Sequence, residues 1–267
     1  MEVTEQEYKN CSHCDNQIIS TSSFCNLCGK FQDVVNLTHL VERKQHLKDA
    51  AIFITFELII CITSNLIEEQ NLYITLGFDS LLVISSIFFF TTLGKEGFKL
   101  LKWPNFSILK LSILVLFTIA CSYLVNKAVD WLNPNVFKVY DLPYYLQYSG
   151  FTYSNYLMIL SIAIIPAIFE ELAYRGYLME KLLKIMGKEE TVYLSSFLFF
   201  LMHFSIASIF WLLPFAIILG KLRLKENSIW LGVLLHFFFN FTSCIVDLYG
   251  SELTLLISEF QFSFWLA

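Results

Sequence analysis

Long apolar runs follow the first forty-odd residues of this chain, and they constrain its fold more than any other feature. Of its 267 residues, 56% are hydrophobic and only 15% are charged, whereas soluble domains usually have about 25% charged residues. One soluble domain cannot bury so much apolar side chain, so we expect a bilayer around these runs. The sequence predicts an all-α, polytopic membrane bundle of about eight transmembrane helices, near 49–67, 71–93, 106–129, 155–175, 191–204, 206–222, 228–248 and 252–267.

The lysines and arginines between these runs predict an orientation in the membrane. If the chain crosses eight times, most of them fall on one side, and only Lys127 and Lys138 fall in a connection on the other. By the positive-inside rule, the N- and C-termini of this multi-pass cell-membrane protein should both be cytoplasmic. The biased set is Lys9, Lys30, Arg43, Lys44, Lys48, Lys95, Lys99, Lys102, Lys181, Lys184, Lys188, Lys221, Arg223 and Lys225.

Four cysteines near the N-terminus form two Cys-x2-Cys pairs, Cys11 with Cys14 and Cys25 with Cys28. Two such turns offer four thiolates to one tetrahedral Zn²⁺ ion, as in a zinc ribbon. Two disulfides are the alternative, but a cytoplasmic terminus lies in a reducing compartment. We therefore expect a zinc ribbon over residues 1–30, in which a structural Zn²⁺ supplies most of the folding energy.

The rest of the chain divides into a linker and the membrane bundle. Residues 31–48 alternate polar and apolar side chains with helical spacing, which predicts an amphipathic linker helix on the membrane face. The bundle then occupies 49–267. The net charge is -5 and the basic residues are dispersed, so we expect no nucleic-acid partner.

Several polar side chains fall inside the apolar runs, where a charge costs about 2.5–3.5 kcal/mol or more. On a helix, Glu171 and Arg175 are four residues apart and can pair, which leaves Glu170 with a free carboxylate. The other such residues are His203, the pair His236 and Asn240, and the isolated Glu57, Asp79 and Lys110.

Counting residues along the predicted spans places three of these groups at similar depth. At about 1.5 Å per residue, Glu170, His236 and His203 lie about 9, 12 and 18 Å above the cytoplasmic edge of the bilayer core. Interhelical hydrogen bonding is the alternative for each histidine. Convergence of a carboxylate with two imidazoles favours a common site. Glu57, Asp79 and Lys110 carry no motif, and we interpret them as structural or accessory groups that line a hydrated cavity or pair across helices.

Three short patterns appear in order along the chain: Glu170-Glu171-x-x-x-Arg175, Phe199-x-x-x-His203 and His236-x-x-x-Asn240. Taken together, they resemble the CPBP (Abi) family, the CAAX proteases and bacteriocin-processing enzymes related to type II CAAX prenyl endopeptidases. The resemblance covers a motif core of about 150–250. It implies an intramembrane endopeptidase.

The resemblance also implies a role for each residue. Glu170 and His203 would activate a water molecule, and His236 with Asn240 would stabilise the oxyanion, while Glu171, Arg175 and Phe199 would support the site. Peptide hydrolysis needs such a base and such donors. A carboxylate and two histidines could also hold a catalytic Zn²⁺. We favour a site without catalytic metal, because no His-Glu-x-x-His motif is present.

The implied substrate is a membrane-embedded peptide or a lipidated, prenylated-type protein. The zinc ribbon would contact a cytoplasmic protein partner. A non-catalytic membrane adaptor or bacteriocin-immunity protein of the same fold is the alternative, with the ribbon as its interaction module. A solute transporter is a third hypothesis, but the sequence has no repeat between its halves and no paired broken helices.

Overall fold

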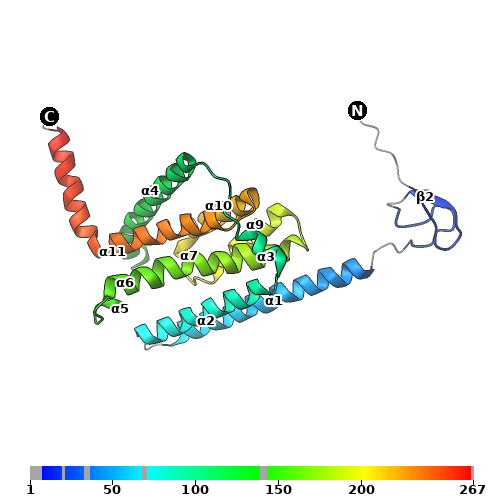
Figure 1. Cartoon of the computed structure of the whole chain (residues 1–267), viewed down its shortest axis with the longest axis horizontal. Coiled ribbons are helices and arrows are strands. Elements are labelled where there is room, and N and C mark those ends of the chain that lie inside the picture. Colours follow the sequence, from blue (N-terminus) through cyan, green and yellow to red (C-terminus); the bar gives the residue numbers. More distant parts are fainter. Residues whose placement is uncertain (1–7, 20–21, 33–36, 68–70, 139–142, 266–267) are drawn as a thin grey trace. The chain divides into compact units, whose positions relative to one another are not determined.

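Helices make up nearly all of the secondary structure in this computed structural model, which describes residues 8–19, 22–32, 37–67, 71–138 and 143–265 (Figure 1). The prediction of an all-α membrane bundle with a small cysteine module at its N-terminus is confirmed. The chain divides into two units, Met1–Lys48 and Asp49–Ala267.

The first unit contains a short antiparallel hairpin, β1 (Tyr8–Asn10) and β2 (Gln17–Ile19), in which Lys9 pairs with Ile18. Its two Cys-x2-Cys turns have the same backbone geometry. The N–H of Asp15 donates to the carbonyl of Cys11, and the N–H of Gly29 donates to the carbonyl of Cys25, both at 2.9 Å. Asp15 and Gly29 both have positive φ, 58° and 68°, which lets each turn reverse tightly.

Helix α1 (Leu37–Leu66) joins the predicted linker to the first predicted span without a break. Residues 37–48 are therefore part of the same helix as the span and do not form a separate one, while residues 33–36 lie outside the described residues.

Five described helices are long and apolar enough to cross a membrane, fewer than the eight predicted spans. They cover Val41–Leu66, Leu72–Thr91, Ile108–Phe137, Ser154–Leu183 and Trp230–Gly250. They include α2 (Leu72–Thr91), α4 (Ile108–Leu132) with the π-helical turn η1 (Asn133–Phe137), and the first part of α11 (Trp230–Trp265).

The other three predicted spans do not form separate membrane-length helices, for physical reasons. Residues 191–204 and 206–222 become α9 (Lys188–Leu201) and α10 (Leu212–Glu226), with 14 and 15 residues, too short for a bilayer core of about 30 Å. The last predicted span is not a separate helix but part of α11, which extends as far as Trp265. The predicted cytoplasmic C-terminus depends on a separate crossing there.

The segment that carries Glu170 is one helical run interrupted by π-helical turns. It passes from α6 (Ser154–Ile159) through η2 (Leu160–Ile164), α7 (Ile165–Glu170) and η3 (Glu171–Leu178) to α8 (Met179–Leu183). Pro166 has no N–H to donate to the carbonyl of Ile162, four residues earlier. The side-chain amide of Asn240 on α11 donates to this carbonyl instead, at 3.0 Å. Such turns often mark functional sites.

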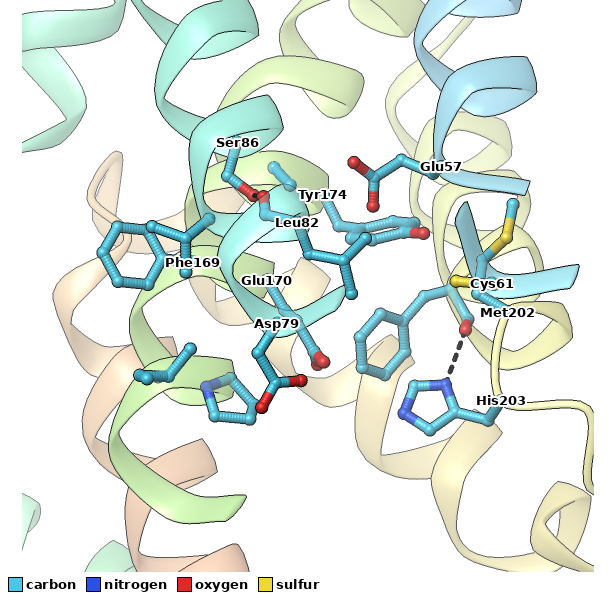
Figure 2. Close-up of a pocket in the computed structure, with 15 residues that line it drawn as sticks. Glu57, Cys61, Asp79, Leu82, Ser86, Phe169, Glu170, Tyr174, Met202 and His203 are labelled. Carbon is cyan, nitrogen blue, oxygen red and sulfur yellow. Dashed lines mark hydrogen bonds between the residues drawn. The ribbon is translucent and has the colours of Figure 1, made fainter. Parts of the chain in front are cut away.

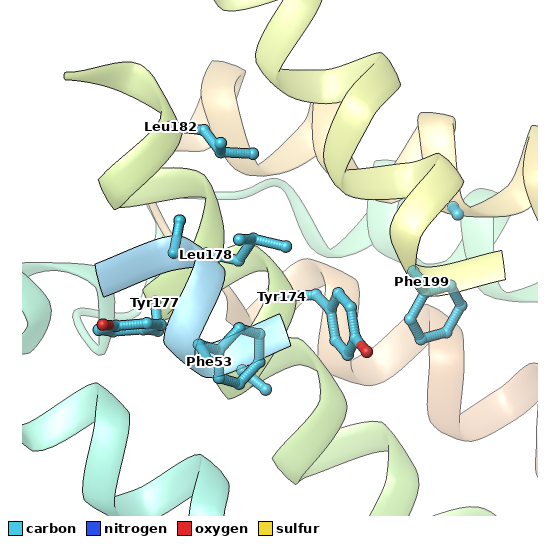
Figure 3. Close-up of a cluster of buried hydrophobic side chains, with 9 residues drawn as sticks. Phe53, Tyr174, Tyr177, Leu178, Leu182 and Phe199 are labelled. Atoms are coloured by element: carbon cyan, nitrogen blue, oxygen red, sulfur yellow. The ribbon is translucent and has the colours of Figure 1, made fainter. Parts of the chain in front are cut away.

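This interrupted run lies at the centre of the second unit, where its π-helical turns and α7 pack against α2 and α11 (Figure 1). Beside it, aromatic rings join α1 and α9 to η3, and Figure 3 shows Phe53, Tyr174 and Phe199 in this buried cluster. The ring centroids of Phe53 and Tyr174 are 5.8 Å apart, and those of Tyr174 and Phe199 are 5.1 Å apart. The short elements are α3 (Lys95–Leu100), α5 (Tyr145–Tyr148) and η4 (Ile206–Phe210).

Candidate functional site

A cavity of about 180 Å³ lies beside the interrupted run, between α1, α2, α7, η3 and the end of α9 (Figure 2). Its lining combines apolar side chains with three carboxylates and one imidazole. These polar groups are Glu57, Asp79, Glu170 and His203.

Glu170 ends α7, and its carboxylate points into this cavity (Figure 2). The side chain is 30% exposed. Its Oε2 atom is buried and has no hydrogen-bond partner within the described chain. A carboxylate with a free lone pair inside a cavity can accept a proton from a bound water molecule.

His203 lines the same cavity. Its sequence context predicted a position on a membrane helix, but the structure places it beyond the end of α9. Helix α9 ends at Leu201, and His203 follows in an exposed turn. Its Nδ1 lies 3.0 Å from the carbonyl oxygen of Phe199, to which it donates in the tautomer that carries a proton on Nδ1. In that tautomer Nε2 is left as an acceptor.

Glu171 is fully buried and contacts both Arg175, a predicted supporting residue, and His236, a predicted catalytic residue. Its Oε1 atom accepts a hydrogen bond from Arg175 Nη1 at 3.0 Å and lies 3.1 Å from His236 Nδ1. A carboxylate can only accept, so Nδ1 of His236 carries the proton and donates to Glu171. The other ring nitrogen, Nε2, lies 3.7 Å from Glu170 Oε2, which is too long for a hydrogen bond.

Phe199 connects this network to the aromatic cluster. The Arg175 guanidinium lies 4.5 Å from the centre of the Phe199 ring, a favourable position for a cation over an aromatic face. The rings of His203 and His236 lie at 4.8 and 6.1 Å from the same ring. Phe199 therefore contacts three of the polar residues that the sequence singled out.

Asn240 is the one predicted catalytic residue whose side chain the structure directs elsewhere. Its amide donates to the Ile162 carbonyl at 3.0 Å, and Asn240, like His236, is not among the residues that line the cavity. The structure thus brings Glu170, Glu171, Arg175, Phe199, His203 and His236 together, and leaves Asn240 one turn further along α11.

Glu57 and Asp79 share the cavity with Glu170, an arrangement that the sequence left open. Ser85 donates to Glu57 at 2.5 Å, and Ser161 donates to Asp79 at 2.8 Å. Each serine–carboxylate pair links two different helical segments, and both acids line the cavity. These acids therefore both line a cavity and pair across helices, the two possibilities that the sequence left open. The only sequence signal was an acid in an apolar run, because the serine partners are distant in the chain.

Lys110 lies elsewhere, exposed in the first turn of α4. It lines a second cavity, of about 590 Å³, with Lys225 on α10.

The four N-terminal cysteines form a candidate metal centre. Their sulfur atoms all lie within 4.8 Å of one another, and the distance is 3.7 Å both for Cys11 to Cys28 and for Cys14 to Cys25. A tetrahedral site with Zn–S bonds of about 2.3 Å has sulfur atoms about 3.8 Å apart, so this donor set fits a metal ion. Within the described residues, no other group of three or more His, Cys, Asp or Glu ligand atoms is as close.

Backbone N–H groups surround one of these sulfur atoms. Those of Cys28 and Leu27 donate to Cys25 Sγ at 3.5 and 3.4 Å. These hydrogen bonds stabilise the thiolate and lower the pKa of Cys25. A thiolate is the form that binds metal.

Comparison with known proteins gives one match. Residues 152–242, about a third of the chain, match the family described as type II CAAX prenyl endopeptidase Rce1-like. The matched segment contains Glu170, His203, His236 and Asn240 and excludes the cysteine module and α1 to α4. Neither a curated protein nor a solved structure matches the chain.

Proposed function

We propose that this protein is a membrane endopeptidase whose site is the cavity beside Glu170, because residues 152–242 match the family described as type II CAAX prenyl endopeptidase Rce1-like. The five membrane-length helices support a multi-pass arrangement. The main support comes from the shared cavity: an unpartnered Glu170 oxygen and the His203 imidazole line one hollow next to the paired Glu171 and His236.

In this proposal, Glu170 takes a proton from a water molecule as the oxygen of that water attacks the peptide carbonyl. His203 holds the water through Nε2, because Nδ1 is engaged with the Phe199 carbonyl. A positioned base of this kind contributes about 10²- to 10⁴-fold to the rate. The proton on Glu170 then passes to the leaving amine as the peptide bond breaks.

Glu171 and Arg175 position His236 in this scheme. Glu171 binds the Nδ1 proton of His236, and Arg175 compensates the charge of Glu171 while its Nη2 donates to the Ala216 carbonyl at 3.1 Å. An oxyanion role for His236 would require a proton on Nε2 as well, because Nδ1 already donates to Glu171. An oxyanion role for Asn240 would require its amide to leave the Ile162 carbonyl.

The substrate in this proposal is a membrane-embedded peptide or a lipidated, prenylated-type protein, because the cavity lies among helices suited to lipid. The positive-inside rule supports a cytoplasmic N-terminus, since the clusters around Lys48, Lys99, Lys184 and Lys225 still share one side if α9 and α10 form a short in-and-out pair.

We further propose that the cysteine centre holds a structural Zn²⁺ and that the ribbon contacts a cytoplasmic protein. Four thiolates at tetrahedral spacing suit Zn²⁺ better than harder ions. Exposed Phe24, Leu27 and Phe31 on this unit offer an apolar surface for such a partner.

Cleavage of a lipidated-peptide library by the purified full-length protein tests the proposal. Glu170→Gln should lower the cleavage rate about 10²- to 10⁴-fold, whereas Glu189→Gln, an exposed acid at the start of α9, should leave it unchanged. Thermal unfolding confirms that both variants are folded. Full activity of Glu170→Gln would refute catalysis by this residue. No cleavage by the unmodified protein, together with phenotypic rescue by the Glu170→Gln protein, would favour the adaptor or immunity hypothesis.

A second arm tests the role of metal. The Cys25→Ser variant removes one ligand of the ribbon metal in advance, so any further effect of a chelator on its activity reports on another metal. Activity that survives chelation supports a glutamate-dependent mechanism. Activity that is lost on chelation and restored by added Zn²⁺ contradicts it.

A further inference from the structure

The second cavity, of about 590 Å³, lies between the start of α4 and the end of α10. Lys110 lines it from α4 and Lys225 lines it from α10. Neither lysine has a hydrogen bond or ion pair within the described chain, and one acid, Glu226, is also in the lining. The cavity therefore has unpaired positive charge.

The lining is ordered by polarity along both helices. On α4, Ile113 and Leu114 follow Lys110 by three and four residues and so lie on the same face, about 4.5–6 Å deeper. On α10, which reaches the cavity from the opposite direction, Leu222 precedes Lys225 by three residues. Both helices thus carry a lysine at the rim and apolar side chains below it.

Additional donors lie at the rim. The N-terminal residue that caps α4, Ser107, makes no side-chain capping bond, and the first N–H groups of a helix have no acceptor within it. Ser107 and Asn105 both line the cavity. These groups and the lysines together suit an anion with several oxygen atoms.

Two tryptophans that are close in sequence to lining residues indicate the depth of the cavity in the membrane. Trp103 is 59% exposed and lies 6.0 Å from Trp230, ring centre to ring centre. Trp230 Nε1 donates to the Leu101 carbonyl at 2.7 Å. Tryptophan prefers the level of the lipid headgroups, so the rim of the cavity lies at the membrane surface on the side rich in lysine.

We propose that this cavity binds an anionic phospholipid of the cytoplasmic leaflet, with its phosphate at Lys110 and Lys225 and its acyl chains along Ile113, Leu114 and Leu222. The order of lining groups matches the order of groups in such a lipid. The charge of the lysines selects an anionic headgroup over a zwitterionic one. The inference is independent of proteolysis and of the cavity beside Glu170.

Native mass spectrometry of the detergent-solubilised full-length protein tests this inference. Titrations with phosphatidylglycerol, phosphatidylcholine and inorganic phosphate separate a lipid site from a site for a free anion. We expect phosphatidylglycerol to bind more tightly than either. Phosphatidylcholine of equal affinity, or inorganic phosphate of equal affinity, would overturn the proposal.

Charge variants locate the binding. The double variant Lys110→Gln, Lys225→Gln should bind phosphatidylglycerol about 10- to 30-fold more weakly. The matched control Lys95→Gln, Lys188→Gln removes the same charge from two exposed positions that do not line the cavity, and it should bind like the unmodified protein. An equal loss in the control would mean that only the overall charge matters, and would refute the site.

A gain in affinity cannot result from misfolding. Glu226→Gln removes the acid from the lining and should strengthen phosphatidylglycerol binding about threefold. Unchanged or weaker binding by this folded variant would contradict the assigned position of the phosphate.

Discussion

The two polar clusters of this protein differ in where their residues come from. The cysteine cluster comes from one short stretch, Cys11 to Cys28, and its geometry is set by two similar turns. The acid–histidine cluster comes from α1, α2, α7, η3, α11 and the turn after α9, and it consists of Glu57, Asp79, Glu170, Glu171, His203 and His236. The first could hold a metal ion, and the described part of its unit has almost no apolar core to stabilise it otherwise. The second is held by buried ion pairs and helix packing, so its stability and its chemistry should respond to different substitutions.

The largest effect should come from the cysteine cluster. Cys25→Ser, or removal of metal with a chelator, should abolish hydrogen-exchange protection throughout the ribbon and leave the helical unit unchanged, because metal binding and folding are coupled. The control Cys121→Ser alters a half-buried cysteine on α4, outside the ribbon. If the ribbon stays protected both in the Cys25→Ser variant and in the presence of the chelator, its fold does not depend on metal.

The next largest effect concerns the buried ion pair of Glu171 and Arg175, whose side chains are 0% and 2% exposed. Arg175→Ala should lower the free energy of unfolding by about 3–5 kcal/mol, because it leaves Glu171 charged and buried without its partner. Lys99→Gln breaks the exposed pair with Glu96 and should have no measurable effect. Reversible unfolding in mixed detergent measures the free energy of unfolding of both variants. Equal losses would contradict the expected difference between the buried and the exposed ion pair.

A smaller effect tests the close approach of α11 to Glu171. A Cβ atom at Gly232 would lie 2.7 Å from Glu171 Oε2. Gly232→Ala should therefore displace this carboxylate and cost about 1–3 kcal/mol. Gly77→Ala places a Cβ where no atom lies within 4 Å and should cost nothing. The same unfolding assay decides, and a neutral Gly232→Ala would show that Glu171 has room to move.

The smallest effect concerns Asn240. Asn240→Ala should cost about 0.6 kcal/mol, and at most about 1.7 kcal/mol, the range found for hydrogen bonds between membrane helices. In the Pro166→Ala background this cost should fall, because residue 166 then has an N–H for the Ile162 carbonyl. A double-mutant cycle measures the coupling. An unchanged cost would mean that Asn240 does not compensate for the proline.

The cysteine cluster could be predicted from sequence because all its ligands are close in the chain and their spacing defines the geometry. The pairing of Glu171 with Arg175 followed from helical spacing in the same way and is found at 3.0 Å. Glu170, His203 and His236 could be grouped because their motifs occur in order and counting residues gave them similar depth.

The remaining features depend on packing that spacing does not encode. The serine partners of Glu57 and Asp79 come from other helices, so no local pattern places these acids beside Glu170. Helix α9 ends at Leu201 although apolar residues continue, and the chain reverses through Phe204, whose φ is positive, 47°. Hydropathy alone could not show that break, which is why two short helices were predicted as membrane spans.

The number of residues in the π-helical turn Leu160–Ile164 sets how the side chains before Glu170 are oriented. Such a turn holds about one residue more than an α-helical turn, as after a one-residue insertion. Deleting one residue there would restore a regular frame and rotate Ser161 and Ile162 by about 100° relative to Glu170. Asp79 and Asn240 would then lose their partners. Among chains of this kind, the number of residues in this turn should therefore separate subgroups more sharply than the identity of any one of them.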